Sequence, residues 1–253
     1  MMTIAYIGPP RGIYAREAWA EILKSWRLPQ FILPTIVLPV AFYGLFAIAM
    51  SDGNAGTATY ALATFGVFAA IGPSLFGFGA GIADERAANL IELKRVSPLP
   101  GAAYLAAKVT ASGVFTGVAV LAIYALGLAA GGVRLGMGQW LALFAIHIGS
   151  VVPFALIGLG IGMRMSAKGA IAAANLLFLA FCVLGGLWFP IDQLPGWIGA
   201  LAWVLPSYHL GELALIATGL PREHGVWLHL ACLAGLTLAA GAFALTGWRR
   251  SAA

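Results

Sequence analysis

Charged residues are scarce in this sequence, and cysteine is almost absent. Asp, Glu, Lys and Arg make up 9% of the 253 residues, whereas soluble domains carry about 25%. So low a charge content argues against a disordered chain and against an ordinary soluble domain, including a large aqueous catalytic domain. Cysteine occurs only at Cys182 and Cys232, both within apolar runs. The sequence therefore indicates neither a disulfide framework nor a cysteine-based metal cluster.

Apolar residues dominate instead, and they gather in long runs. They form 61% of the chain, and the mean hydropathy is +0.93. About 20 apolar residues in a helix cross the ~30 Å hydrocarbon core of a bilayer. The runs predict an all-α polytopic membrane protein, one transmembrane domain over residues 1–253, with six spans at 28–50, 57–83, 109–130, 140–163, 169–189 and 227–248.

Lys and Arg are distributed unequally between the two sides of these spans. Twelve of the 14 lie before the first span, after the second and fourth spans, or after the last, and only Arg134 and Arg222 lie on the other side. Cytoplasmic loops are enriched in Lys and Arg. We therefore expect both termini of this multi-pass protein in the cytoplasm.

Two further segments are partly apolar without being able to cross a membrane. In 1–27, apolar residues recur at helical spacing between charged ones, at Ala15, Trp19, Ile22, Leu23 and Trp26. This pattern predicts an amphipathic helix in the cytoplasmic interface, either as an anchor or with a mechanical role. In 190–225, a short apolar piece is bracketed by prolines, which predicts an outer re-entrant segment between the fifth and sixth spans.

Several motifs that would indicate other functions are missing. The nearest approach to a phosphate-binding loop, from Gly162 to Lys168, lacks the Gly before the Lys and the hydroxyl after it. This chain is therefore not expected to hydrolyse ATP. No span carries Asp or Glu near its centre, which disfavours a proton- or ion-coupled transporter.

Four groups of residues resemble one family in order and spacing. They are RLPQF (27–31) with Pro34 and PVAFY (39–43); ER (85–86), IELKRVSPL (91–99) and YLAAK (104–108); GLWFP (186–190) with LPGW (194–197); and LPSYH (205–209). Together with the six spans, they resemble the permease subunits of ABC-2 type transporters, the bacterial type-2 ABC exporters. One departure is Ala87-Ala88-Asn89, where many relatives have a Gly-Thr-Leu pattern.

The resemblance implies the transmembrane permease subunit of an ATP-driven exporter in a bacterial inner membrane. The expected partners are the lipid bilayer, a second permease copy as a homodimer, and separate ABC ATPase subunits. ATP and Mg would bind to those ATPase subunits, and this chain would hold no cofactor, metal or nucleic acid. The expected substrate is hydrophobic or amphipathic: a drug, a lipid or a lipid-linked molecule.

The segment 84–100 is the internal cytoplasmic stretch that could receive force from an ATPase. Charged residues surround the apolar Leu90, Ile91 and Leu93, a pattern suited to a short helix docked on a partner. In the resembled family this segment is the coupling helix, which implies coupling roles for Asp84, Glu85, Arg86, Asn89, Glu92, Lys94 and Arg95. The alternative is a solvated loop whose charges only enforce topology.

A substrate path between two permeases would be lined by the first, second and fifth spans in this family. Its candidate residues here are Phe42, Tyr43, Phe46, Phe76, Phe78, Asn175 and Phe181. Aromatic residues in membrane helices also face lipid or pack against other helices. Two other functions stay open: an intramembrane enzyme that uses His209 and Glu212, which could share a helical face, and a structural or sensor subunit.

Overall fold

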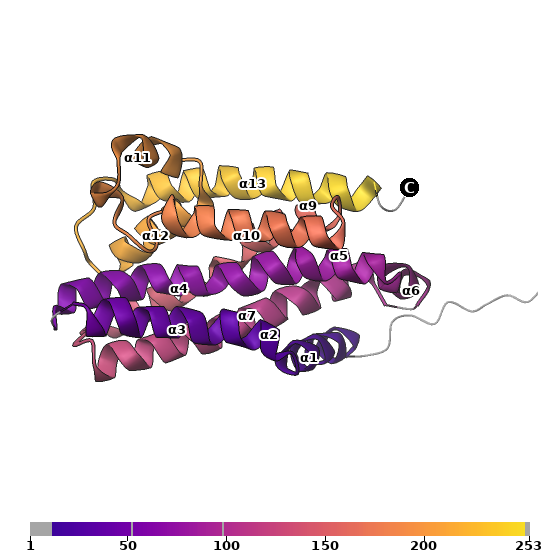
Figure 1. Cartoon of the computed structure of the whole chain (residues 1–253), viewed down its shortest axis with the longest axis horizontal. Coiled ribbons are helices and arrows are strands. Elements are labelled where there is room, and N and C mark those ends of the chain that lie inside the picture. Colours follow the sequence, from indigo (N-terminus) through magenta and orange to yellow (C-terminus); the bar gives the residue numbers. More distant parts are fainter. Residues whose placement is uncertain (1–11, 52, 98, 251–253) are drawn as a thin grey trace, which may run out of the picture.

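The computed structural model describes residues 12–51, 53–97 and 99–250, and this part of the chain is helical (Figure 1). The first eleven residues of the expected interfacial segment lie outside the described residues, as do Pro98 and the side chain of Arg95 in 84–100. The elements are α1 Ile13–Trp26, α2 Pro29–Ile32, η1 Leu33–Val37, α3 Leu38–Tyr43, η2 Gly44–Ala49, α4 Ala55–Phe78, α5 Ala80–Ala87, α6 Leu90–Val96, α7 Gly101–Ala129, α8 Met137–Gly149, α9 Val151–Gly162, α10 Ala167–Val183, η3 Ile191–Gln193, α11 Gly196–Ala202, α12 Pro206–Ala217 and α13 Val226–Arg250.

Five helical stretches are long and apolar enough to cross a bilayer. They are Pro29–Ala49, Ala55–Ala87, Gly101–Ala129, Met137–Gly162 and Val226–Arg249. The first stretch is continuous from α2 to η2, although two wide π-helical segments interrupt its α-helical geometry. Pro34 and Pro39 lie in this stretch, and a proline removes a backbone donor from a helix. The predicted all-helical, multi-span fold is confirmed.

The fifth expected span, 169–189, is shorter than predicted. Its helix, α10, has 17 residues, which at 1.5 Å per residue is roughly 25 Å. The chain turns immediately afterwards, because Gly186 adopts a left-handed φ of 73°. The amides of Leu187 and Trp188 then both donate to the carbonyl of Cys182, which closes the end of the helix.

Helix α4 forms the centre of the bundle. In its most apolar part, 89% of the residues are buried, against 22% in the first stretch and 17% in α13. Figure 1 shows α4 between α3 and α7 on one side and α10 on the other. Most residues of the first stretch and of α13 are therefore not buried within the chain and keep some surface for lipid or for another protein.

The packing of α9 against α4 and α5 depends on glycine. A Cβ added at Gly162 would lie 2.5 Å from the carbonyl oxygen of Phe78 and 2.6 Å from that of Gly79. A Cβ at Gly158 would lie 2.9 Å from the carbonyl oxygen of Leu75. These backbones approach so closely that no larger residue fits without movement, as is common where membrane helices pack through small residues.

The segment between the last two long helices is bent back on itself. Helices α11 and α12 meet at 93° across a short break, and Pro206 begins α12. Figure 1 shows α11 at the end of the bundle opposite to α6. This pair fits the predicted re-entrant segment. We call the two ends of the bundle the α6 end and the α11 end.

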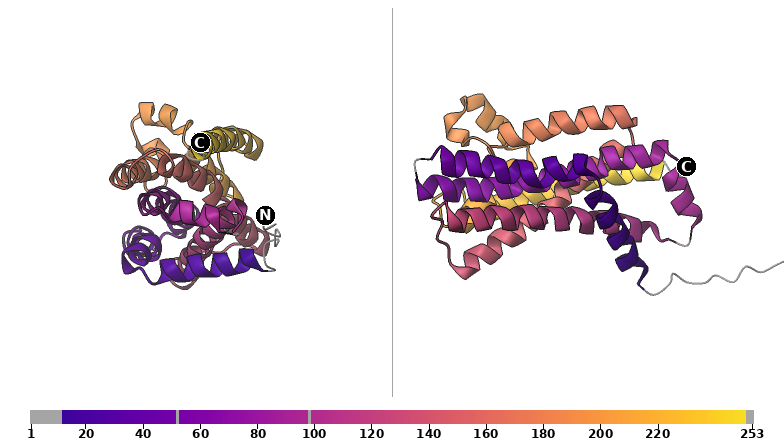
Figure 2. Two further views of the ribbon diagram at one scale, coloured as in Figure 1. Left: turned by 90° about the vertical axis from the view of Figure 1, so that its right-hand side faces the viewer. Right: turned by 60° about the horizontal axis from the view of Figure 1, so that its bottom comes forward.

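Helix α1 lies across the α6 end instead of continuing the bundle. In the end-on view of Figure 2, α1 is seen from its side, whereas the long helices are seen down their axes. Trp19 and Trp26 are exposed, at 65% and 56%, while Ile22 and Leu23 are half-buried. The amphipathic helix predicted in 1–27 is thus present. Trp19 is mostly exposed, whereas the ring of Trp26 also stacks on Phe115 of α7, with centres 6.1 Å apart.

Candidate functional site

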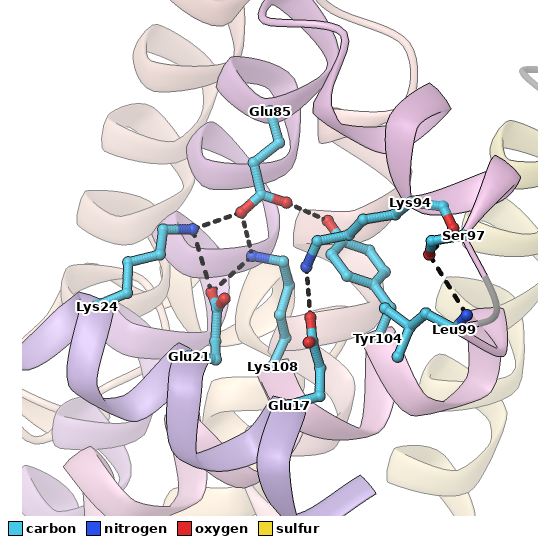
Figure 3. Close-up of polar contacts among 9 residues, drawn as sticks. All are labelled: Glu17, Glu21, Lys24, Glu85, Lys94, Ser97, Leu99, Tyr104 and Lys108. Carbon is cyan, nitrogen blue, oxygen red and sulfur yellow. Dashed lines mark hydrogen bonds and ion pairs between the residues drawn. The ribbon is translucent and has the colours of Figure 1, made fainter. Parts of the chain in front are cut away.

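The site most relevant to coupling is a group of charged side chains at the α6 end, brought together by four helices (Figure 3). On α1, the residues Glu17, Glu21 and Lys24 follow one another at helical spacing and so share a face. Tyr104 and Lys108 are four residues apart on α7, and α5 and α6 add one charged residue each. We call the group the charged cluster: Glu17, Glu21, Lys24, Glu85, Lys94, Tyr104 and Lys108.

Glu85 is the acceptor that connects most of the charged cluster. Its Oε1 accepts hydrogen bonds from Lys24 Nζ at 2.5 Å and from Lys108 Nζ at 3.0 Å. Its Oε2 accepts a hydrogen bond from the Tyr104 hydroxyl at 2.5 Å. Lys108 Nζ also donates to Glu21 Oε1 at 2.8 Å. One carboxylate on α5 is therefore bound to both α1 and α7.

Through Lys94, the charged cluster also connects α6 to α1 and α7. Lys94 forms an ion pair with Glu17 of α1, and its ammonium lies 4.6 Å from the centre of the Tyr104 ring. The cluster as a whole holds three lysines and three glutamates, so its formal charges balance. A balanced, hydrogen-bonded group is the form in which charges are tolerated inside a protein.

Burial makes these contacts matter for stability. Glu85 is 6% exposed and Lys108 is 4% exposed. Removing one partner of a buried ion pair costs about 3–5 kcal/mol, because the other charge is left without compensation. Burial disfavours the charge on the more exposed Lys24, but Glu21 and Glu85 outweigh this effect and raise its pKa. The cluster therefore fixes α1, α5 and α7 in one arrangement.

The neighbouring residue, Arg86, connects α5 to a different part of the bundle. Its Nη1 donates a hydrogen bond to the carbonyl oxygen of Gly162 at 2.6 Å, at the end of α9. A cation is favourable there, because the last carbonyls of a helix have no partner within the helix and carry partial negative charge. Helix α5 is thus bound to α1 and α7 through Glu85 and to α9 through Arg86.

The residues predicted for coupling divide into two groups in the structure. Glu85, Arg86 and Lys94 contact other parts of the chain, so Glu85 in particular is turned inward and is not offered to a partner. The predicted Asp84, Asn89 and Glu92 are exposed. With the apolar side chains between and beyond them, they form a surface that we call the α6 face: Asp84, Asn89, Leu90, Glu92, Leu93 and Val96.

The α6 face has the composition of a docking surface. Leu90, Leu93 and Val96 are 43%, 63% and 83% exposed, which is high for large apolar residues. Ile91, expected among them, instead packs inward at 3% exposure. A cleft of about 170 Å³, lined in part by Ile91, Lys94 and Trp248, lies beside this face. A short helix with apolar residues at its exposed surface is typical of helix-in-groove recognition.

The candidate path residues are only partly brought together. Phe42, Phe46 and Phe76 belong to one aromatic group with four residues that the sequence analysis missed. We call it the aromatic cluster: Phe42, Phe46, Phe65, Phe68, Phe76, Phe178 and Trp188. The missed residues come from α4, α10 and the turn after α10, and their meeting depends on tertiary packing that no local pattern encodes.

The other candidate path residues lie elsewhere. Tyr43 is buried and donates its hydroxyl to the carbonyl of Ala58, and Phe181 packs against Phe154 in the interior. Phe78 belongs to a second apolar group at the α6 end. Asn175 is exposed on α10, and its side-chain amide donates to the carbonyl of Ile171 in its own helix.

The alternative site for an intramembrane enzyme does not form a catalytic pair. His209 contacts the carbonyl of Trp203 through Nε2 and Nδ1 of His229 through Nδ1, both at 3.0 Å. Glu212 instead accepts two hydrogen bonds from Arg222, at 2.8 Å and 2.5 Å. Each residue is therefore occupied by a separate structural partner, and both hold the segment after α11 in place.

Comparison with known proteins agrees with this architecture. Residues 17–218, most of the chain, match the family described as "ABC-2 type transporter". The chain belongs to the ABC-2 type transporter family. It is similar to the Bacillus subtilis (strain 168) protein named "Putative transport permease YvfS", with 26% identity over 225 residues, which is 87% of this chain and 91% of that protein.

A second likeness covers only part of a larger protein. The "Thiol:disulfide interchange protein DsbD" of Ralstonia nicotianae (strain ATCC BAA-1114 / GMI1000) is 26% identical over 252 residues, which is 97% of this chain but 36% of that protein. This likeness spans about a third of DsbD. The ABC-2 permease is a multi-pass membrane protein and is not itself catalytic, and permeases of this kind pair with ATPase subunits.

Proposed function

We propose that this ABC-2 permease is the membrane subunit of an ATP-driven exporter in a bacterial inner membrane, with its α6 end in the cytoplasm. The distribution of Lys and Arg supports this orientation, because twelve of the 14 belong to the side that includes α1, α5 and α6. Both chain termini belong to the same side. In this orientation the α6 face is exposed to the cytoplasm, where an ATPase subunit binds.

One observation carries this proposal: two adjacent residues of α5 connect this helix to other helices on two sides. Glu85 connects it to α1 and α7, and Arg86 connects it to α9. Helix α5 also continues into α4 through Gly79. A movement imposed on the α6 face would therefore reach the centre of the bundle and both flanking helices together, as a coupling segment requires.

The ATPase supplies the energy in this proposal. It binds ATP and Mg, and the permease contributes only the transmembrane path. We further propose that two permease copies form a homodimer, since the first span and α13 are 22% and 17% buried within one chain and leave wide apolar surfaces. A second copy and the surrounding lipid would cover these surfaces.

The proposed substrate is hydrophobic or amphipathic: a drug, a lipid or a lipid-linked molecule. The support is the aromatic cluster, in which Phe42, Phe46 and Phe76 lie on the spans expected to line the path. Aromatic rings bind apolar molecules through large contact areas and stack with flat ones. Export, and not import, is favoured because the described residues at the α11 end form no separate domain for capturing an external ligand.

The docking part of this proposal is tested with variants of the α6 face. We expect Glu92→Arg and Leu93→Asp to weaken binding of the ATPase subunit at least about tenfold, since each removes an exposed contact at the centre of the proposed interface. The matched control is Lys168→Glu, a charge reversal at an exposed residue at the start of α10. The measurement is the Kd of purified permease for its ATPase in detergent. Unchanged binding by both variants would remove the assignment.

A further inference from the structure

A cavity of about 550 Å³ opens at the α11 end, between segments far apart in sequence. Its walls come from η2, from the first three turns of α4, from the turn that follows α10 and the adjoining η3, and from the loop between α12 and α13. A volume of this size lies within the range of about 300–1,000 Å³ that is typical of small-molecule sites.

One wall of this cavity is aromatic. Phe46, Phe65, Trp188 and Phe189 line it. The ring of Phe46 stacks on Phe65 with centres 6.2 Å apart and meets the edge of Phe189 at 6.4 Å. Trp188 in turn contacts Phe42 and Phe68, so the wall is the exposed edge of the aromatic cluster. Rings fixed by one another in this way offer a preformed surface for a flat apolar body.

The cavity also has polar lining residues, and its main charge is already balanced. Arg222 lines the cavity and donates to both oxygens of Glu212 through Nε and Nη2. These two bonds raise the pKa of Arg222, which stays charged. A guanidinium has five N–H donors, so the contacts with Glu212 leave donors for an acceptor in the cavity. Gln193 also lines the cavity, as does Tyr60, whose hydroxyl donates a hydrogen bond to the carbonyl of Gly186.

We propose that this cavity binds an amphipathic molecule with a flat, ring-containing apolar body and a head that carries oxygen acceptors without net negative charge. The aromatic wall would hold the body, and the donors of Arg222 and Gln193 would hold the head. A strongly anionic head is disfavoured because Glu212 already neutralises Arg222. The proposal rests on the proposed function: at the outer end of the bundle, this site is where an exported amphiphile leaves the permease.

Binding of an uncharged naphthyl ketone, 6-propionyl-2-dimethylaminonaphthalene, tests the proposal without ATPase or ATP. Its fluorescence shifts when it enters an apolar site, and it carries both a flat ring body and a carbonyl acceptor. The full-length permease is measured in detergent and in lipid nanodiscs, with empty nanodiscs as background. We expect saturable binding. A sulfonated naphthalene of similar size, which adds a negative charge, should bind at least about tenfold more weakly.

Variants then locate the binding. Trp188→Ala and Gln193→Ala should raise the Kd for the naphthyl ketone about tenfold and about threefold. Arg222→Lys, which keeps a cation for Glu212 but loses the forked donor geometry, should raise it several-fold. The controls Trp197→Ala and Arg134→Gln change exposed residues of the same types outside the cavity and should leave the Kd within about twofold. Gel filtration confirms that each variant is folded.

Three results would overturn the proposal. They are the absence of saturable binding, equal losses in the cavity variants and the controls, and binding that persists in detergent but vanishes in nanodiscs. The last would identify a bilayer lipid as the occupant. None of these results bears on ATPase docking, which is measured at the other end of the molecule, so failure of this site and failure of the proposed function are distinguishable.

Discussion

Glu85 and Asp84 are neighbours on α5 with opposite environments. Asp84 is exposed, whereas Glu85 is 6% exposed and accepts hydrogen bonds from Lys24, Tyr104 and Lys108. The sequence pattern identified both as charged residues of a coupling segment but could not tell which one faces inward. The lysine partners lie 61 and 23 residues away along the chain. Such pairings depend on how α1 and α7 pack against α5, so they could not be predicted from local spacing.

Replacing Glu85 therefore tests whether the charged cluster stabilises the α6 end. We expect Glu85→Gln to lower the free energy of unfolding by about 3 kcal/mol, since it leaves the buried Lys108 with one carboxylate partner instead of two. Asp84→Asn removes the same charge from an exposed position and should change stability by less than about 0.5 kcal/mol. Thermal unfolding of the purified permease in detergent measures both. Equal losses of stability in the two variants would show that the buried ion pairs of Glu85 do not stabilise the fold.

At the scale of elements, the contact between α9 and the junction of α4 and α5 depends on glycine, because backbone oxygens of one element lie directly against the other. Gly162 lies against the carbonyls of Phe78 and Gly79, and the same residue accepts the hydrogen bond from Arg86. Gly158 and Gly162 lie four residues apart, a spacing that permits close helix packing, but the sequence alone does not show which helix packs there. The packing partner is the break at Gly79, immediately before α5.

Gly162→Ala should separate these helices. The new Cβ would meet backbone oxygens at 2.5 Å and 2.6 Å, and overpacking of this kind costs about 1–3 kcal/mol. The control, Gly113→Ala on α7, places its Cβ where no other atom lies within 4 Å. It should be neutral or stabilising by up to about 1 kcal/mol, because alanine favours helix over glycine. The measurement is again thermal unfolding; a neutral Gly162→Ala would contradict the packing described here.

The turn between α5 and α6 depends on Asn89, whose φ is 56°. Asparagine and glycine adopt this left-handed conformation with little strain, whereas a β-branched residue does not. We expect Asn89→Gly to preserve ATPase stimulation and Asn89→Val to reduce it several-fold, since valine would tilt α6 and its exposed face. The ATP hydrolysis rate of the assembled complex provides the readout. Equal stimulation by both variants would show that the direction of α6 is unimportant.

Helix positions were more predictable than helix ends. Long apolar runs gave five of the six expected spans to within several residues, since their length and hydropathy suffice for a bilayer. The fifth was predicted too long, because the apolar Leu187 and Trp188 continue the run after the chain has already turned at Gly186. The π-helical segments of the first span were not predicted, as prolines within a span indicate a disturbance without specifying its geometry.

At the scale of the whole molecule, the two ends of the bundle differ in chemistry. The α6 end holds the charged cluster and the α6 face, whereas the α11 end holds the aromatic-walled cavity and the bent pair α11–α12. The aromatic cluster forms one wall of this cavity and extends from it into the spans. The proposed function assigns energy input to one end and substrate release to the other. The unequal distribution of Lys and Arg in the sequence predicts which end is cytoplasmic. The sequence predicts neither that Glu85 of α5 faces inward nor that a cavity forms at the other end.

The orientation is tested by labelling single cysteines in intact cells. In a background with Cys182→Ser and Cys232→Ser, we expect Ala88→Cys on the α6 end to react with a membrane-impermeant maleimide only after the cells are opened. Gln193→Cys on the α11 end should react without opening, since both positions are exposed in the described structure. Labelling of Ala88→Cys in intact cells would place the α6 end outside and contradict the proposed docking.

The most direct test of the account is ATP-driven transport by defined complexes in liposomes. Permease and ATPase are reconstituted together, and movement of a fluorescent amphiphile is followed for the wild type, Leu93→Asp and the control Lys168→Glu. The account predicts ATP-dependent transport by the wild type and the control, and about a tenth of that rate or less for Leu93→Asp. Transport by the permease without the ATPase, or full transport by Leu93→Asp, would contradict it.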